Sequence, residues 1–142
     1  MSRLDKVGAY LRTTTSLPDK AKEMAVLVTA RRWTLQYQWN GHLRLALKAG
    51  VKKEVADAIA EGRRPTGMTE DEAVSYDFTT ELNQTGTVTD ATYARAVNLF
   101  REQGVIDLTV VNGYYAVLGM VMGVARSPLA SGDAPMLKPL PR

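Results

Sequence analysis

The sequence predicts an all-α protein folded as one domain. Apolar residues recur at helical spacing in segment after segment, and no segment shows the alternation of apolar and polar residues typical of a half-buried strand. A chain of 142 residues has the length of a single domain. Its 45% hydrophobic and 23% charged residues are the composition of a globular protein and exclude disorder. We therefore expect a bundle of about six helices.

Capping and stop signals place the ends of these helices. Thr69 with Glu72 three residues later forms a capping box, which opens a helix. Gly50, Gly62 and Gly104 follow apolar-periodic segments and supply left-handed stops. Residues 3–12 favour a short first helix. The main helices are expected at residues 18–33, 34–49, 52–61, 69–84, 89–103 and 107–124.

The last residues of the chain differ in composition from the rest. Residues 127–142 contain four of the six prolines, interspersed with Gly, Ser and Leu. Such a segment cannot form a helix and is expected to be extended or disordered. We therefore divide the chain into a helical domain, residues 1–126, and a Pro-rich tail, residues 127–142.

Composition excludes several classes of chemistry. The absence of cysteine removes disulfides, thiolate nucleophiles and zinc sites that need sulfur. His42 is the only histidine, so one chain cannot build a multi-histidine metal site. No phosphate-binding loop and no glycine-rich dinucleotide motif is present. We expect neither a metal nor an organic cofactor.

Charge and hydropathy patterns bear on partners and location. The formal net charge is +3, and the basic doublets are scattered rather than gathered in a stripe, so nucleic-acid binding is not expected. Residues 108–125 lack charge, but their polar members favour a buried helix of a soluble fold over a membrane span. No secretion signal is visible, which suits a cytoplasmic protein.

The last predicted helix suggests self-association. It is apolar on all sides, and one small domain has difficulty burying such a helix completely. Gly119 and Gly123 form a small-xxx-small pattern, which permits close helix approach inside the fold or across a subunit interface. We expect a homo-oligomer.

Residues 34–49 carry the most informative candidate site. Gln38 and His42 lie one turn apart on an otherwise apolar helical face. A histidine in that position can exchange protons near neutral pH, or it can be a core residue bonded to a backbone carbonyl. Glu23, at the edge of the preceding apolar face, either points inward or lies in solvent beside Lys20 and Lys22.

Four segments of the sequence resemble a known family. These segments are KEMAVLVTARRWTLQYQWNGHLRLALKAGV, KKEVADAI, SYDFTTELNQTGTVTDATYARAVNLF and VVNGYYAVLGMVMGV. The family that they resemble is the carboxymuconolactone decarboxylase superfamily, which includes the AhpD-type alkylhydroperoxidases. With His42 aligned, the AhpD-type glutamate falls on Glu23 and the two cysteines fall on Leu35 and Gln38. A dithiol peroxidase cannot work without thiolates, so the resemblance is to the cysteine-free branch.

The resemblance implies a helical, oligomerising fold and a set of site residues. Members form trimers or hexamers, and decarboxylases of this family act on γ-carboxymuconolactone without a metal or organic cofactor. On that basis His42 is the expected proton donor and Glu23 the residue that orients it. The substrate-binding residues implied in the same way are Gln38, Tyr37, Trp39, Tyr115 and Arg31, with Arg32 as an alternative to Arg31.

Two classes of function follow from these observations. The first is a cofactor-independent acid–base enzyme, a carboxy-lyase acting on a small carboxylated or lactone substrate, with His42 and Glu23 at its centre. The second is a non-catalytic protein that binds a small molecule or assembles with itself while retaining the fold. They differ in whether His42 lies in an accessible cavity or is sealed in the core.

Overall fold

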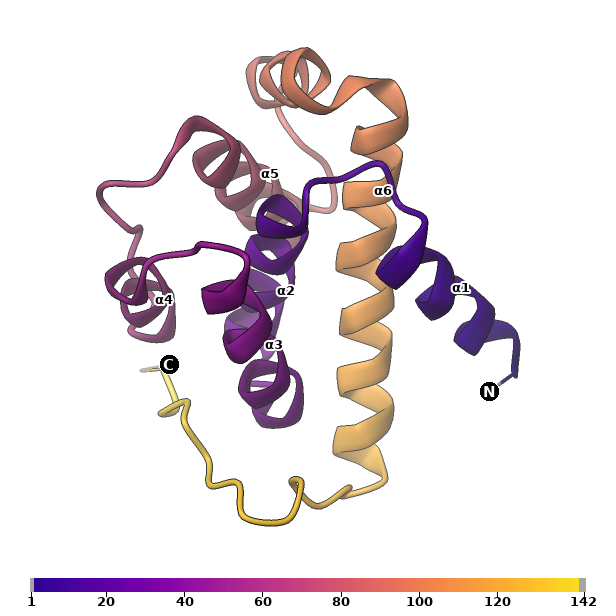
Figure 1. Cartoon of the computed structure of the whole chain (residues 1–142), viewed down its shortest axis with the longest axis vertical. Helices are drawn as coiled ribbons and strands as arrows, with labels where there is room; N and C mark the ends of the chain where they lie inside the picture. The colour runs from indigo at the N-terminus through magenta and orange to yellow at the C-terminus, as the bar shows by residue number, and fades with distance from the viewer. Residues whose placement is uncertain (1, 141–142) are drawn as a thin grey trace.

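The computed structural model describes residues 2–140, and within them the chain is helical without any strand. The all-α prediction is therefore confirmed (Figure 1). The observed helices are α1 (Ser2–Thr13), α2 (Asp19–Trp33), α3 (Gln36–Lys48), α4 (Lys53–Ala60), α5 (Glu70–Thr85) and α6 (Asp90–Val124).

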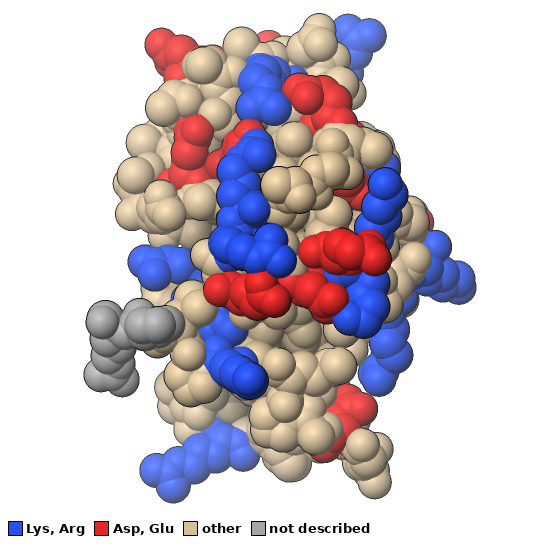
Figure 2. Space-filling model, turned by 90° about the vertical axis from the view of Figure 1, so that its left-hand side faces the viewer, with Lys and Arg blue, Asp and Glu red and all other residues tan. Residues whose placement is uncertain are grey.

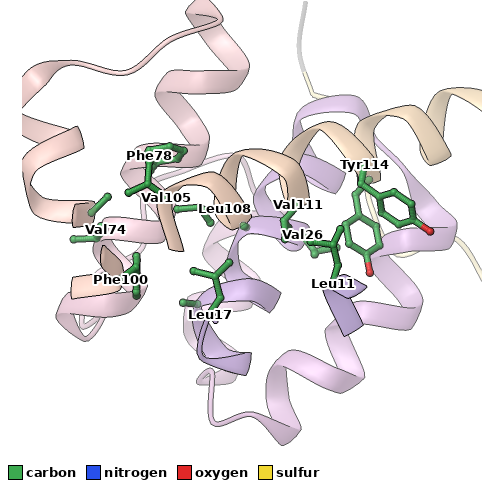
Figure 3. Packing of buried hydrophobic residues seen from close by; sticks show 14 residues of the cluster. Leu11, Leu17, Val26, Val74, Phe78, Phe100, Val105, Leu108, Val111 and Tyr114 are labelled. Carbon is green, nitrogen blue, oxygen red and sulfur yellow. The ribbon is translucent and has the colours of Figure 1, made fainter. Parts of the chain in front are cut away.

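Helix α2 lies at the centre of the bundle and packs against α3, α4, α5 and α6. Residues 21–31 are buried one after another, although the sequence predicted a single buried face. The difference arises because neighbouring helices cover α2 from every side, so even its polar positions lose contact with water. Two apolar clusters flank it. Figure 3 shows the first, which contains Leu11 of α1, Leu17 of the following loop, Val26 of α2 and Leu108 of α6.

Helix α6 bends sharply where two separate helices were predicted. Arg101 has φ 63° and ψ 174°, which are non-helical values, and helical geometry resumes after it. Gly104 is not a stop, contrary to the prediction: it lies within the helix, where a Cβ would overlap the Cβ of Phe100. The first part of α6 lies across the end of the bundle, and the second part runs the length of the molecule (Figure 1).

The apolar part of α6 is half-buried in the molecule. By length and composition the helix could cross a membrane, since its most apolar window has a mean hydropathy of 1.5. However, 44% of that window is buried inside the fold, and the buried part includes the polar residues Asp107 and Asn112. This pattern fits the core helix of a soluble domain.

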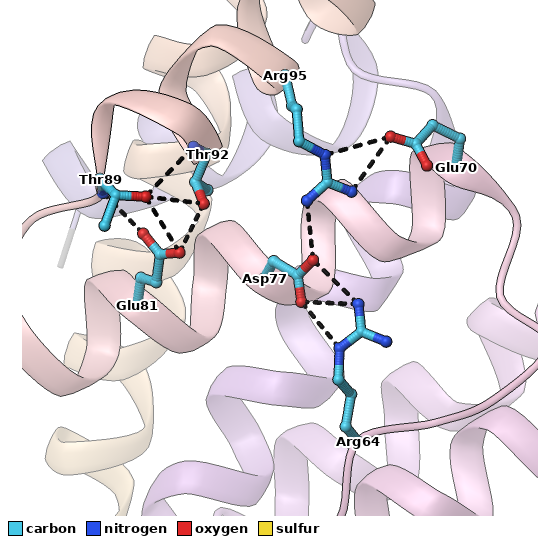
Figure 4. A network of polar contacts seen from close by, with 7 residues as sticks. All are labelled: Arg64, Glu70, Asp77, Glu81, Thr89, Thr92 and Arg95. Carbon is cyan, nitrogen blue, oxygen red and sulfur yellow. Dashed lines mark hydrogen bonds and ion pairs between the residues drawn. The ribbon is translucent and has the colours of Figure 1, made fainter.

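Caps and ion pairs join α5 to the start of α6 (Figure 4). The predicted capping box is present, with the Glu72 carboxylate accepting from the Thr69 backbone N–H at 2.8 Å. Arg95 of α6 contacts Asp77 of α5 at 3.0 Å, and Asp77 also pairs with Arg64 at 3.0 Å. Figure 2 shows acidic and basic side chains interspersed over one face. Exposed pairs of this kind contribute about 0–1 kcal/mol each, so they orient the helices more than they stabilise them.

The tail beyond α6 packs against the bundle. Residues 127–140 form neither helix nor strand and run as an extended segment past α3 toward α4 (Figure 1). Leu137 is buried in the second apolar cluster. The Gln36 side chain donates to the Leu137 carbonyl at 2.7 Å and accepts from the Leu137 N–H at 3.0 Å. Asn40 of α3 donates to the Ala134 carbonyl at 2.8 Å, so α3 is hydrogen-bonded to the tail at two places, Ala134 and Leu137.

Asp107 fastens α1 and the loop after it to α6. Its carboxylate is 1% exposed and accepts from the hydroxyls of Tyr10 and Thr15, each at 2.8 Å. It also accepts from the Ser16 N–H at 2.9 Å and from the Gln103 amide at 3.0 Å. Burial acts to raise the pKa of Asp107, but the hydrogen bonds outweigh it and hold the pKa below its ordinary value.

We predict that Asp107→Asn lowers the free energy of unfolding by about 2–3 kcal/mol at neutral pH, because several donors lose a charged acceptor. Since the folded pKa lies below the unfolded one, the carboxylate's contribution is present above the unfolded pKa and is lost as pH falls through the folded pKa. Urea unfolding of both proteins should therefore converge below about pH 4. Asp57→Asn, which removes an exposed partner of Lys53, is the control. A constant difference between wild type and Asp107→Asn across this pH range would contradict the prediction.

Candidate functional site

A cavity of about 630 Å³ opens between four helices. Helix α2 contributes Glu23 to its wall, and α3 contributes Gln38 and His42. Tyr115 comes from α6 and Arg12 from α1, so the wall joins residues far apart in the sequence. The cavity is large enough for a small-molecule ligand.

Glu23 and His42 meet at the base of this site. The His42 Nδ1 atom lies 2.7 Å from a Glu23 carboxylate oxygen. The Glu23 side chain is 7% exposed and that of His42 is 16% exposed, so the pair is largely withdrawn from water, yet both residues line the cavity. In the tautomer with the proton on Nδ1, the ring donates to the Glu23 carboxylate, which as an anion can only accept. The other ring nitrogen of His42, Nε2, is left for a ligand.

Helical geometry explains why the two residues meet. Glu23 lies on α2, which is buried on all sides, so its carboxylate needs a partner to remain charged. Helix α3 packs along α2 and presents His42 to it. The inward orientation of Glu23 was one of two possibilities that the sequence left open, and it is the one that the structure shows.

Aromatic rings support the histidine from the α6 side. The His42 and Tyr115 ring centroids are 4.6 Å apart at 79°, and Tyr114 packs edge-on against Tyr115 at 5.2 Å. Burial, together with the negative charge of Glu23, raises the pKa of Tyr115 to about 12. Its hydroxyl therefore stays protonated at neutral pH and can act as a hydrogen-bond donor.

A glycine sets the distance between α3 and α6. A Cβ at Gly119 would overlap the Leu35 side chain, so this glycine permits close packing inside the fold. Tyr115 lies one turn before Gly119 on α6, and Met122 lies about one turn after it. Both line the cavity as a result. By contrast, Gly123 has open space around it.

Two more of the predicted α3 residues, Gln38 and Tyr37, also line the cavity. Gln38 is 5% exposed and donates to the Met122 sulfur at 3.2 Å. A thioether is a weak acceptor, so this amide is free to turn to a stronger one. Tyr37 is 46% exposed and lies at the rim.

Trp39 and Arg31, both predicted to bind substrate, lie elsewhere. Trp39 is 2% exposed and packs in the second apolar cluster, because it points from α3 toward α2 and α4, away from the cavity. Arg31 is 4% exposed and donates to the carbonyls of Ala60 and Lys138. Arg32, the alternative to Arg31, stacks on Trp33 with its guanidinium 5.4 Å from the ring centroid. Contrary to the prediction, the structure therefore places none of these three residues in the wall of the main cavity.

Sequence reasoning missed the cationic side of the cavity. Arg12, Lys22 and Lys48 all line it. Lys22 pairs with Asp19 at 2.9 Å, but no carboxylate among residues 2–140 pairs with Arg12 or Lys48. No periodic signal marks Arg12, because only the packing of α1 on α6 brings it there. Gly8 makes that packing possible, since a Cβ at this position would overlap the Tyr114 hydroxyl.

Among residues 2–140, no group of three His, Cys, Asp or Glu side chains is arranged to hold a metal ion. The chemical groups that this cavity offers are the Glu23–His42 pair, the Gln38 amide, the Tyr115 phenol and the cations of its wall.

Comparison with protein families decides the relationship. The carboxymuconolactone decarboxylase family model matches residues 1–81, more than half of the chain. The chain belongs to the carboxymuconolactone decarboxylase family. The matched region contains Glu23, Gln38 and His42, and the chain has no cysteine, as in the cysteine-free branch. Searches of curated proteins and of solved structures found no match.

Proposed function

We propose that this family member is a cofactor-independent acid–base enzyme of the cytoplasm, a lyase that acts on a small carboxylated or lactone substrate. The observation that carries the proposal is the Glu23–His42 contact of 2.7 Å at the wall of an open cavity. A structural histidine would also satisfy the buried Glu23, but it would be sealed in the core, whereas His42 lines the cavity.

The pair is suited to moving one proton. With Nδ1–H bonded to Glu23, the His42 Nε2 atom can accept a proton from solvent and deliver it to a substrate carbon. The Glu23 carboxylate fixes the orientation of the ring and stabilises the imidazolium that forms in between. Because Glu23 is almost fully buried, this electrostatic effect is stronger than it would be in water.

Charge around the cavity favours an anionic substrate. Asp19 is paired with Lys22, and Glu23 with His42, which leaves the charges of Arg12 and Lys48 for a ligand. A substrate carboxylate would satisfy one or both of them. Arg12 therefore takes the role that the sequence assigned to Arg31.

The reaction class that fits these groups is decarboxylation. The bond between the carboxylate carbon and the ring carbon breaks, CO₂ leaves, and the electron pair stays on the substrate as an enolate. The Gln38 amide and the Tyr115 hydroxyl are the donors placed to stabilise that charge. His42 then gives its proton to carbon, which removes the enolate charge, yields the enol-lactone and returns the imidazole to its neutral form.

We predict that His42→Ala lowers kcat for γ-carboxymuconolactone about 10²- to 10⁴-fold, the range that loss of a general acid produces. Glu23→Gln should cause a smaller loss, since it weakens the orientation of His42 without removing the proton donor. Lactone absorbance and CO₂ release measure both. Arg63→Gln, on the surface outside the cavity, is the control.

Circular dichroism of the same variants would separate lost chemistry from lost folding. Equal turnover by wild type and a folded His42→Ala variant would contradict the proton-transfer role. Absence of turnover in all variants would remove this substrate and favour the non-catalytic binding role.

We predict further that Arg12→Gln raises KM for a carboxylated substrate about 10-fold with a smaller change in kcat, because the carboxylate is bound in both the ground and transition states. Arg3→Gln removes the same charge from the same helix at an exposed position outside the cavity. An equal rise of KM in both variants would show a general charge effect and no contact at Arg12.

We also propose that the protein forms a homotrimer or homohexamer through α6. Its outer face exposes Ile106, Val110, Val117, Met120 and Val124, and the spacing of four or three residues between successive members, with Gly113 between them, makes one continuous apolar stripe. Such a stripe is the seam by which helices pack in pairs or bundles.

Light scattering should therefore give a mass of three or six times the 15.6 kDa of one chain at micromolar concentration. Val117→Arg, in the middle of the stripe, should shift the mass toward the monomer because it buries a charge at each contact. The control Tyr93→Arg also changes an exposed apolar position of α6, but Tyr93 lies before the bend at Arg101 and outside the stripe. A monomeric wild-type protein would refute the proposal.

A further inference from the structure

A second, smaller cavity of about 200 Å³ lies on the other side of α2 from the Glu23–His42 pair. Arg31 and Arg32 at the end of α2 form part of its wall, together with Tyr76 and Thr80 of α5. Leu140 of the tail also lines it. No part of the proposed decarboxylation uses these residues.

The polar groups of this wall are incompletely bonded. Three buried side-chain polar atoms in residues 2–140 have no hydrogen-bond partner, and two of them, Arg31 Nε and Thr80 Oγ1, belong to residues of this one cavity. Buried polar groups in proteins are almost always bonded to protein, water or ligand. Their coincidence here indicates a site whose normal occupant is a hydrogen-bond acceptor.

The charge of the wall agrees with that reading. Arg31 is 4% exposed, its bonds are to the Ala60 and Lys138 carbonyls and the Thr34 hydroxyl, and no carboxylate within residues 2–140 pairs with it. Burial lowers the pKa of Arg31, as expected for a guanidinium without an anionic partner. Arg32 adds a second cation, and the wall contains no Asp or Glu. A buried, unpaired cation is unfavourable until an anion compensates it.

The remaining wall is apolar and narrows the choice of anion. Val28, Ile59 and Leu140 face the same space as the two arginines. Inorganic phosphate would bury its charged oxygens against these side chains, whereas a carboxylate with a short hydrocarbon chain would match both halves of the wall.

We propose that this cavity is a second ligand site, which binds a short-chain monocarboxylate between Arg31, Arg32 and Thr80. The carboxylate accepts from the guanidinium groups and the hydroxyl, and its hydrocarbon part lies against Ile59 and Leu140. Because the Lys138 carbonyl is bonded to Arg31, an occupied site also holds the tail in place. The inference is independent of the proposed decarboxylation.

The chain offers unusually specific reporters for a test by NMR. It contains two isoleucines, Ile59 in this cavity and Ile106 on the exposed face of α6. His42, the single histidine, reports on the main cavity. Full-length protein with labelled isoleucine methyl groups is titrated with sodium butyrate at constant ionic strength. We expect a saturable shift of the Ile59 signal with a Kd of about 1 mM, and no such shift of Ile106.

Variants assign the binding to named groups. Arg32→Gln and Thr80→Val should each weaken butyrate binding at Ile59 about 5-fold, whereas Arg63→Gln, outside the cavity, should not. These two variants spare Arg31, whose bonds to Ala60 and Lys138 also support the fold. Arg12→Gln should abolish any effect of butyrate on His42 and leave the Ile59 response intact, which separates the two cavities.

Several outcomes would overturn the proposal. A linear Ile59 shift would show that the cavity has no binding site for butyrate, and a saturable shift unchanged in Arg32→Gln and Thr80→Val would show that these groups do not bind the carboxylate. An equal response to butanol would show apolar binding without anion recognition, and an equal response to inorganic phosphate would refute the carboxylate class. A response confined to His42 would place all carboxylate binding in the main cavity.

Discussion

Helix α2 is enclosed by its neighbours over residues 21–31, and this enclosure withdraws two opposite charges from water. Glu23 and Arg31 are 5% and 4% exposed, at opposite ends of the buried stretch. A buried charge destabilises the fold unless it is compensated, so each end of α2 needs a partner. His42 serves Glu23, whereas backbone carbonyls and a hydroxyl serve Arg31. The two cavities described above lie beside these two charges.

Helix α3 divides its surface between three tasks. One face of α3 carries Gln38 and His42 to the main cavity, and a second buries Trp39 in the core. A third face is hydrogen-bonded to the tail through Gln36 and Asn40. The catalytic candidates are thus held from the opposite side of the helix by a segment about a hundred residues later in the chain, as the separation of Gln36 and Leu137 shows. The tail is therefore part of the packed fold, with Leu137 buried in the second apolar cluster.

One position that carries a cysteine in the AhpD-type pattern has a packing role in this chain. Leu35 stands there, and its side chain fills the space that Gly119 leaves on α6. That contact brings α6 close enough for Tyr115 to reach His42. The family match covers residues 1–81 and so includes the acid–base pair, whereas Tyr115 and the tail lie outside it. The shared region contains the Glu23–His42 pair, and the rest of the chain shapes the space around it.

Local sequence signals determined the helical class, most helix ends and the placement of Gln38 and His42 on one helical face. The capping box at Thr69, the glycine stops at Gly50 and Gly62, and the spacing of Gln38 and His42 depend on neighbours within a turn or two, so the chain shows them directly. The tertiary structure alone decided what distant segments do to one another: the bend of α6 at Arg101, the inward side of Glu23, the burial of Trp39 and Arg31, the docking of Leu137 and the arrival of Arg12 at the cavity. Helical periodicity specifies that a face is buried. It does not specify which helix will cover it, and the cavities depend on that choice.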